Sequence, residues 1–166
     1  MVQTWNEKID IIITLFGYVL IKDRPLNTNT EDEILHTMQE FYSGINSIPK
    51  EALFISLPNI IFPVNPLRKL LKQLTANKKV KPIQTTRKRQ LKYLPHIRER
   101  LKIINCDRCV HVDWLDLWCN KKGRCPAFDS RQITMFMDQH HVSNYGAMYV
   151  GDYLLRLYNK FMKTRH

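Results

Sequence analysis

The chain has 166 residues, 44% of them hydrophobic, and its formal net charge is +11. This length provides for about one domain with its own core, and the composition excludes disordered and fibrous classes of protein. The longest apolar stretch, residues 9–21, includes Asp10 and is shorter than the roughly 20 residues that a transmembrane helix needs. Because Glu7 and Asp10 interrupt the N-terminal segment, we expect neither a signal peptide nor a transmembrane segment in the chain itself.

Positive charge is concentrated in residues 68–102, which contain 13 of the 26 Lys and Arg residues and a single acid, Glu99. Such a segment can bind phosphate groups, or it can form a solvated surface without a partner. Proteins that bind single-stranded nucleic acid usually add aromatic side chains on which bases stack. Here Tyr93 is the single aromatic residue between Phe62 and Trp114. We therefore expect no nucleic-acid partner.

The first half of the chain predicts a strand, a helix and a second strand. Residues 8–21 are rich in β-branched and apolar side chains, as a buried strand of a parallel sheet is. Thr30 is placed to cap a helix, and Glu33 would complete a capping box with it. One apolar stripe of this helix is formed by Ile34, Met38, Phe41 and Ile45. Residues 52–58 are again apolar and predict a second buried strand.

The second half predicts a loop, a basic helix, a third strand and a terminal helix. Prolines at positions 58, 63 and 66 mark the loop. The basic helix begins near Thr85, with a kink or a restart at Pro95, and its apolar face is formed by Leu91, Leu94, Ile97 and Leu101. The third strand is either 101–105 or 109–114, and the last helix covers 146–162. This alternation predicts a single α/β domain with a mostly parallel sheet.

Four cysteines, Cys106, Cys109, Cys119 and Cys125, lie within 20 residues. The first pair has the C-x2-C spacing of zinc ligands, but the C-x5-C spacing of the second pair is loose for a zinc site. Two disulfides would instead indicate an oxidising compartment, and four cysteines allow three pairings. The sequence is compatible with disulfides, a zinc site or free thiols. We prefer disulfides because an even number of cysteines close together in the sequence favours pairing.

The segment MDQHHVSNYGA contains an acid and a histidine three residues apart, Asp138 and His141. A histidine that acts as a general base needs a carboxylate to orient its ring and to stabilise the imidazolium, and this spacing can supply both groups from one turn. Ser143 is placed to cap the last helix, and Gly146 would allow close packing at its start. A polar loop that caps a helix explains the same residues without any catalysis.

The same segment resembles the final block of the SGNH hydrolase superfamily, in which D-x-x-H is followed by a small apolar residue, Ser or Thr, and then Gly-Ala. More specifically, the chain resembles the C-terminal SGNH domain of the membrane O-acyltransferases of the acyltransferase-3 family, nematode type. The stretches DIII, EILHTMQEFY, ALFISLPN, LPHIRERLK and VDWLDLWC agree with this domain in order and character. The resemblance covers residues 8–162.

The resemblance implies a three-layer, flavodoxin-like α/β fold and an acyl-ester transfer or hydrolysis activity, with His141 as the base and Asp138 as its orienting acid. The serine nucleophile of this family belongs to a Gly-Asp-Ser block after the first strand, and this chain contains no such block. We therefore expect residues 1–166 to form a single partial SGNH domain that lacks its first strand and its nucleophile. Such a domain would be inactive by itself.

The resemblance also implies the surroundings of the domain. A membrane acyltransferase domain would precede it in cis, and the domain would be monomeric and would lie in the lumen or outside the cell, with disulfides among its four cysteines. No cofactor and no metal are expected, and the acyl donor and acceptor are unknown. The alternative function is a basic module that binds zinc through its cysteines and docks on nucleic acid.

Overall fold

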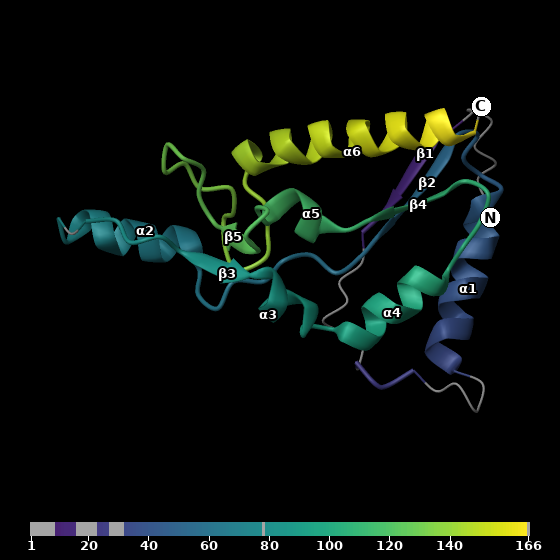
Figure 1. The fold of residues 1–166 in the computed structure, drawn as a ribbon, viewed down its shortest axis with the longest axis horizontal. Helices are drawn as coiled ribbons and strands as arrows, with labels where there is room; N and C mark the ends of the chain where they lie inside the picture. Colours follow the sequence, from purple (N-terminus) through teal and green to yellow (C-terminus); the bar gives the residue numbers. More distant parts are fainter. Residues whose placement is uncertain (1–8, 16–22, 27–31, 78, 166) are drawn as a thin grey trace, which may run out of the picture. The chain divides into compact units, whose positions relative to one another are not determined.

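The computed structural model describes residues 9–15, 23–26, 32–77 and 79–165. The chain forms two compact units. Unit 1 comprises Met1–Pro58, Leu94–Val112 and Phe161–His166, and unit 2 comprises Asn59–Tyr93 and Asp113–Lys160. Each unit has its own sheet, which is parallel and three-stranded in unit 1 and antiparallel and two-stranded in unit 2 (Figure 1).

The sheet of unit 1 consists of β1 (Ile11–Thr14), β2 (Ala52–Ser56) and β4 (Cys109–Val112), in the order β1-β2-β4. Both pairings are parallel, and their registers place Ile11 opposite Ala52 and Leu53 opposite Cys109. All five residues of β2 are buried, as a continuous apolar run predicts for the central strand of a parallel sheet. The α/β fold with a parallel sheet is therefore confirmed.

Two helices, α1 (Glu33–Asn46) and α4 (Pro95–Ile103), pack on one face of this sheet. Side chains that alternate along a strand point to the same face, and alternate residues of the β2 segment share one hydrophobic cluster with both helices. This cluster is the core of unit 1 and contains Leu53, Ile55, Leu57, Tyr42, Ile97, Leu101 and Ile104.

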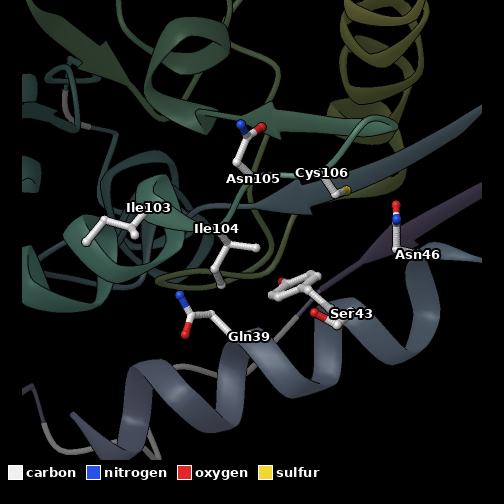
Figure 2. A pocket seen from close by; sticks show the side chains of 8 residues that line it. Gln39, Ser43, Asn46, Ile103, Ile104, Asn105 and Cys106 are labelled. Carbon is white, nitrogen blue, oxygen red and sulfur yellow. The ribbon is translucent and has the colours of Figure 1, made fainter. Parts of the chain in front are cut away.

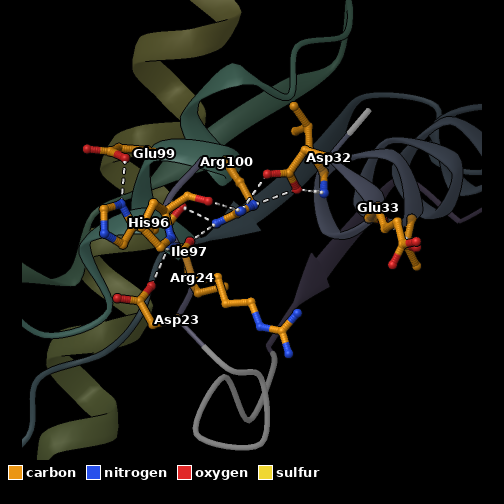
Figure 3. Close-up of polar contacts among 11 residues, drawn as sticks. Asp23, Arg24, Asp32, Glu33, His96, Ile97, Glu99 and Arg100 are labelled. Carbon is orange, nitrogen blue, oxygen red and sulfur yellow. Dashed lines mark hydrogen bonds and ion pairs between the residues drawn. The ribbon is translucent and has the colours of Figure 1, made fainter. Parts of the chain in front are cut away.

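Polar contacts fix the first turns of α1 and α4 (Figure 3). Asp32 caps α1 by accepting a hydrogen bond from the backbone N–H of Leu35 at 2.9 Å. The same carboxylate pairs with the guanidinium of Arg100 in α4, with 2.5 Å between Asp32 Oδ2 and Arg100 Nη2. Asp23 accepts a hydrogen bond from the backbone N–H of Ile97 at 2.9 Å. Carboxylates therefore satisfy backbone donors at the start of both helices.

Unit 2 is built mainly from short elements. Three aromatic rings pack edge to face in its core, with 4.8 Å between the centroids of Phe62 and Phe136 and 4.9 Å between those of Trp118 and Phe136. Its elements are α2 (Pro66–Thr75), β3 (Gln84–Thr86), α3 (Arg87–Leu91), α5 (Trp114–Trp118), β5 (Arg124–Pro126) and the greater part of α6 (Asn144–Thr164).

The structure corrects several predicted element boundaries. The basic helix restarts at Pro95, which is one of the two predicted alternatives, because Leu94 adopts a left-handed conformation with a φ of 51°. The first piece, α3, begins at Arg87 and not near Thr85. The cap of α1 is Asp32, whereas Thr30, the expected cap, lies outside the described residues. Around Pro66 the expected loop is replaced by α2, because proline is compatible with the first turn of a helix.

The third strand is β4, so the second of the two predicted alternatives is correct and residues 101–105 are not a strand.

The chain contains two disulfides. The first joins Cys106 to Cys109 across the turn that leads into β4, and the second joins Cys119, after α5, to Cys125 in β5. Their Cα–Cα distances are 5.0 and 4.0 Å. Each disulfide lies within one unit and closes a short loop.

Candidate acid–base site

The D-x-x-H segment forms a short loop of unit 2, residues 137–143, which we call the site loop. An isolated antiparallel bridge between Phe136 and Val142 closes this loop. Inside the bridge, the backbone N–H of Met137 donates to the carbonyl oxygen of His141 at 2.9 Å. Backbone hydrogen bonds therefore hold the two ends of the site loop together.

The tip of the site loop is held by the segment that follows β2 in the sequence. The backbone N–H of Phe62 donates to the carbonyl oxygen of Gln139 at 2.8 Å, and the side-chain amide of Gln139 donates back to the carbonyl oxygen of Phe62 at 3.2 Å. The amide of Asn59 lies 3.4 Å from the carbonyl oxygen of His140. No local pattern in the sequence marks Asn59, Phe62 or Gln139 as partners, because nothing in it pairs positions about 80 residues apart.

Asp138 and His141 are in direct contact, with 2.6 Å between Asp138 Oδ2 and His141 Nδ1. The other carboxylate oxygen accepts the backbone N–H groups of His140 at 2.9 Å and His141 at 2.8 Å. These two bonds fix the carboxylate, as in an Asx turn. With Nδ1–H donated to Asp138, the Nε2 atom of a neutral imidazole retains the free lone pair. The His141 side chain is 61% exposed, so this nitrogen is open to a reacting group.

The pKa of the Asp138 carboxyl group is well below its usual value. Partial desolvation raises this pKa, but the hydrogen bonds from the backbone N–H of His140 and from the ring and backbone of His141 outweigh that effect. Asp138 therefore stays ionised at neutral pH. A carboxylate in this state can orient the ring of His141 and stabilise it when it becomes positively charged.

Ser143 and Gly146 join the site loop to α6. The hydroxyl of Ser143 donates to the carbonyl oxygen of Thr134 at 2.8 Å and accepts the backbone N–H of Gly146 at 3.0 Å. Ser143 thus caps the first turn of α6, as its position in the sequence predicts. Its hydroxyl is used for structure and does not contact His141.

In the described parts of the chain, no serine, threonine or cysteine side chain is hydrogen-bonded to His141. The serines of unit 2 are Ser130 and Ser143, and the second of them is engaged by Thr134 and Gly146. The site loop therefore presents an acid and a base, but no hydroxyl group lies against the base in these residues.

His140 lies beside the pair without taking part in its short hydrogen bond. The ring centroids of His140 and His141 are 4.1 Å apart, and His140 Nδ1 is 3.8 Å from Asp138 Oδ1. Ligand atoms of the three side chains lie within 4.8 Å of one another, a grouping of the kind that can hold a metal ion. The sequence predicted no metal here, and the Nδ1 atom of His141 is already bound by Asp138.

The four cysteines do not converge on one point. Their sulfur atoms form the pairs Cys106–Cys109 and Cys119–Cys125, and no described cysteine is free. A zinc site needs thiolate ligands, and a cysteine in a disulfide cannot supply one. The structure therefore favours disulfides among the three possibilities that the sequence left open.

A separate pocket of about 550 Å³ lies in unit 1, between α1 and the residues that follow α4. Figure 2 shows Gln39 and Ser43 on the helix side, with Ile104 and Asn105 across from them. None of its lining residues belongs to the site loop. The pocket is therefore not part of the acid–base pair.

A family model described as "SGNH domain (fused to AT3 domains)" matches residues 16–156. The chain belongs to this family. The matched range includes the site loop and most residues of both units, so the resemblance seen in the sequence is confirmed, as is the α/β fold expected for an SGNH domain. No curated protein and no solved structure matches the chain.

SGNH domains of this family are described as fused to AT3 domains, which gives this domain a membrane-protein context. Within the described residues, no helix combines the length and the apolar character needed to cross a bilayer.

Proposed function

We propose that this SGNH domain uses His141 as the general base and Asp138 as its orienting acid in acyl-ester transfer or hydrolysis. The observation that carries the proposal is the 2.6 Å contact between Asp138 Oδ2 and His141 Nδ1, on a carboxylate that two backbone N–H groups hold in place. This arrangement leaves Nε2 of His141 available to take a proton. If the loop only capped α6, it would need Ser143, but it would not need the contact between Asp138 and His141.

In the proposed reaction, Nε2 of His141 removes the proton from a serine hydroxyl as the serine oxygen attacks the carbonyl carbon of an acyl ester. The resulting imidazolium is stabilised by Asp138. It then returns the proton to the leaving alcohol as the tetrahedral intermediate collapses to an acyl-enzyme. An acceptor hydroxyl or water, activated by the same nitrogen, finally takes the acyl group and releases the serine.

The serine in this scheme comes from a Gly-Asp-Ser block, which this sequence does not contain. We therefore propose that residues 1–166 form the C-terminal part of a single SGNH domain and are inactive by themselves. The family match supports one domain, because it runs through segments of both units without a break. The first strand and the nucleophile block would belong to the part of the domain that precedes these residues.

We further propose that the domain acts in the lumen or outside the cell, next to a membrane acyltransferase domain in the same protein. The two disulfides support an oxidising compartment, and the family description supports the fusion. The alternative of a zinc-binding nucleic-acid module loses its metal ligands to these disulfides, so we do not favour it.

Labelling with a fluorophosphonate, which reacts with activated serines, tests the proposed division of the site. We expect the 166-residue chain to show no labelling and no hydrolysis of a nitrophenyl ester above background. We expect activity when a segment with a Gly-Asp-Ser block from another member of the family precedes the chain. In that longer protein, Asp138→Asn should reduce turnover by about four orders of magnitude if its role matches that of the acid in a serine-protease triad.

His140→Ala is the matched control in the longer protein, because His140 is next to the base but outside the short hydrogen bond. It should retain most of the activity, whereas His141→Ala should lose it. Labelling of the short chain that disappears in His141→Ala would show that a nucleophile is already present. Equal activity of His141→Ala and His140→Ala in the longer protein would refute the role of His141 as the base.

A further inference from the structure

The helix α2 (Pro66–Thr75) has an apolar side that the fold leaves partly uncovered. Its four leucines, at positions 67, 70, 71 and 74, follow the spacing of one side of a helix. Leu70 is buried in unit 2, but Leu71 is 52% exposed and Leu74 is 51% exposed. Val64, just before the helix, is also exposed. A surface helix normally turns such a stripe toward the core, so this stripe has room for a partner.

The opposite side of α2 is basic. Arg68, Lys69 and Lys72 lie on it. Residues 79–83, which lead from α2 to β3 and which we call the returning segment, add Lys79 and Lys81. All five residues are exposed. Within the described residues, none of the five forms an ion pair.

 The sequence also has no acidic residue from 59 to 98 that could neutralise these five cations.

The helix is fixed before any partner binds. Asn65 caps it by accepting the backbone N–H of Arg68 at 2.9 Å, and Pro66 occupies its first turn. The side chain of Gln73 accepts the backbone N–H of Lys81 at 2.6 Å, which holds the returning segment beside the helix. Within unit 2, α2 extends away from β3 and β5 (Figure 1). A partner would therefore meet a formed helix and would not have to order it.

We propose that α2 binds the headgroup layer of a bilayer that contains anionic lipid. Leu71 and Leu74 would enter the boundary between headgroups and acyl chains, and the cations of α2 and of the returning segment would contact lipid phosphates. A short amphipathic helix with leucines on one side and Lys or Arg on the other has the composition of helices that lie in this interface. Long basic side chains can reach the phosphates while their stems lie along the apolar boundary.

A nucleic acid would use the same positive charges but would leave the two leucines in water. A membrane uses both sides of the helix, and this is the reason for choosing it. The proposal does not depend on the Asp138–His141 pair, so either proposal can fail while the other stands.

Vesicle co-sedimentation of the disulfide-intact 166-residue chain tests the proposal. We expect the chain to sediment with phosphatidylcholine vesicles that contain about 30 mol% phosphatidylserine, and not with phosphatidylcholine alone. Binding should weaken as NaCl rises from about 50 mM to about 300 mM, because salt screens the headgroup charge. Equal sedimentation with both kinds of vesicle, or with neither, would overturn the proposal.

A triple variant of α2 and a matched control locate the binding surface. The triple variant Arg68→Glu, Lys69→Glu, Lys72→Glu should weaken binding at least about 100-fold, since each cation near an anionic surface contributes about fivefold. Its control, Lys121→Glu, Lys122→Glu, Lys160→Glu, has the same net charge and should lose far less. An equal loss in both would mean that binding follows net charge and not α2.

The leucines distinguish a membrane from a nucleic acid. Leu71→Gln combined with Leu74→Gln should weaken vesicle binding at least about tenfold, because it removes the inserted apolar area. Leu155→Gln, an exposed leucine of α6, should leave vesicle binding unchanged, and circular dichroism should show that all variants keep their helices. If the double leucine variant binds the vesicles as well as the unmodified chain does, and a short DNA duplex binds equally tightly, the surface recognises charge alone and the proposal is wrong.

Discussion

Gly146 allows the start of α6 to pack closely against the backbone of Met135, just before the site loop. A methyl group at this position would collide with the carbonyl oxygen of Met135 and would lie 2.6 Å from Val142 Cγ1. Val142 directly follows His141, and its backbone bridges to Phe136. The absence of a side chain at one residue therefore decides whether the loop that carries the acid–base pair can keep its position against the helix.

We expect Gly146→Ala to lower the free energy of unfolding by about 1–3 kcal/mol, because a backbone carbonyl and a closed loop have to move to admit the methyl group. Urea denaturation followed by circular dichroism measures this change. Gly151→Ala is the matched control in the same helix, since nothing lies within 4 Å of its added carbon. It should raise stability by up to about 1 kcal/mol, as expected for an exposed helix position. A similar effect of both substitutions would contradict the close packing at Gly146.

At the scale of elements, α1 and α4 are joined by a buried ion pair as well as by their apolar cluster. The Arg100 side chain is 1% exposed and that of Asp32 is 7% exposed. The guanidinium also donates to the carbonyl oxygens of Arg24 at 2.8 Å, His96 at 3.2 Å and Pro25 at 3.1 Å. With Asp32, the acceptors of this guanidinium come from three parts of the chain. The Arg100 side chain therefore ties the segment before α1, the cap of α1 and the first turn of α4 together (Figure 3).

We expect Arg100→Met to lower the free energy of unfolding by about 3–5 kcal/mol, since it leaves the Asp32 carboxylate buried without its cation. The double variant Arg100→Met, Asp32→Ser removes both charges, and serine can still cap α1. It should recover most of the loss, because replacing both members of a buried pair costs far less than removing one. Urea unfolding of both single variants and the double variant gives the coupling energy. A double variant no more stable than Arg100→Met would contradict the pairing.

At the scale of the whole molecule, the chain passes between the two units four times, after Pro58, Tyr93, Val112 and Lys160. Two of these passages follow the carboxyl ends of β2 and β4 closely. Neither unit is therefore one continuous piece of chain. Each has its own short disulfide, Cys106–Cys109 in unit 1 and Cys119–Cys125 in unit 2, so the covalent cross-links strengthen each unit locally and do not join the two.

We expect the purified chain to have no thiol that reacts with Ellman's reagent until it is reduced, and to bind no zinc. Replacing either pair of cysteines by alanine should lower the free energy of unfolding by about 2 kcal/mol, the value expected for closing such short loops in the unfolded chain. The two double variants should have similar effects because both loops are short. Reactive thiols in the native protein, with stoichiometric zinc, would instead support the zinc-binding alternative.

The sequence predicted the elements whose signal is local. The apolar run of β2, the buried Ile97 and Leu101 of α4 and the Ser143 cap of α6 lie where the pattern predicts, because each depends on neighbours along the chain. Leu91 and Leu94, which were expected on the same helix face, lie outside α4, and Leu91 is 43% exposed. The cap of α1 and the whole of α2 were missed. Asp32 caps α1, and its carboxylate also contacts Arg100, which is 68 residues away in sequence. The prolines before α2 resembled those of a loop.

For the candidate site, the sequence by itself determined which residues could carry the chemistry: an acid and a histidine at the right spacing, followed by a serine and a glycine that start a helix. Only the tertiary structure decided that Asp138 and His141 are in contact and which segment holds the loop that carries them. The physical reason is that spacing along a chain limits which groups can meet. The distance between two side chains also depends on the distant residues, such as Phe62 and Asn59, that fix the backbone between them.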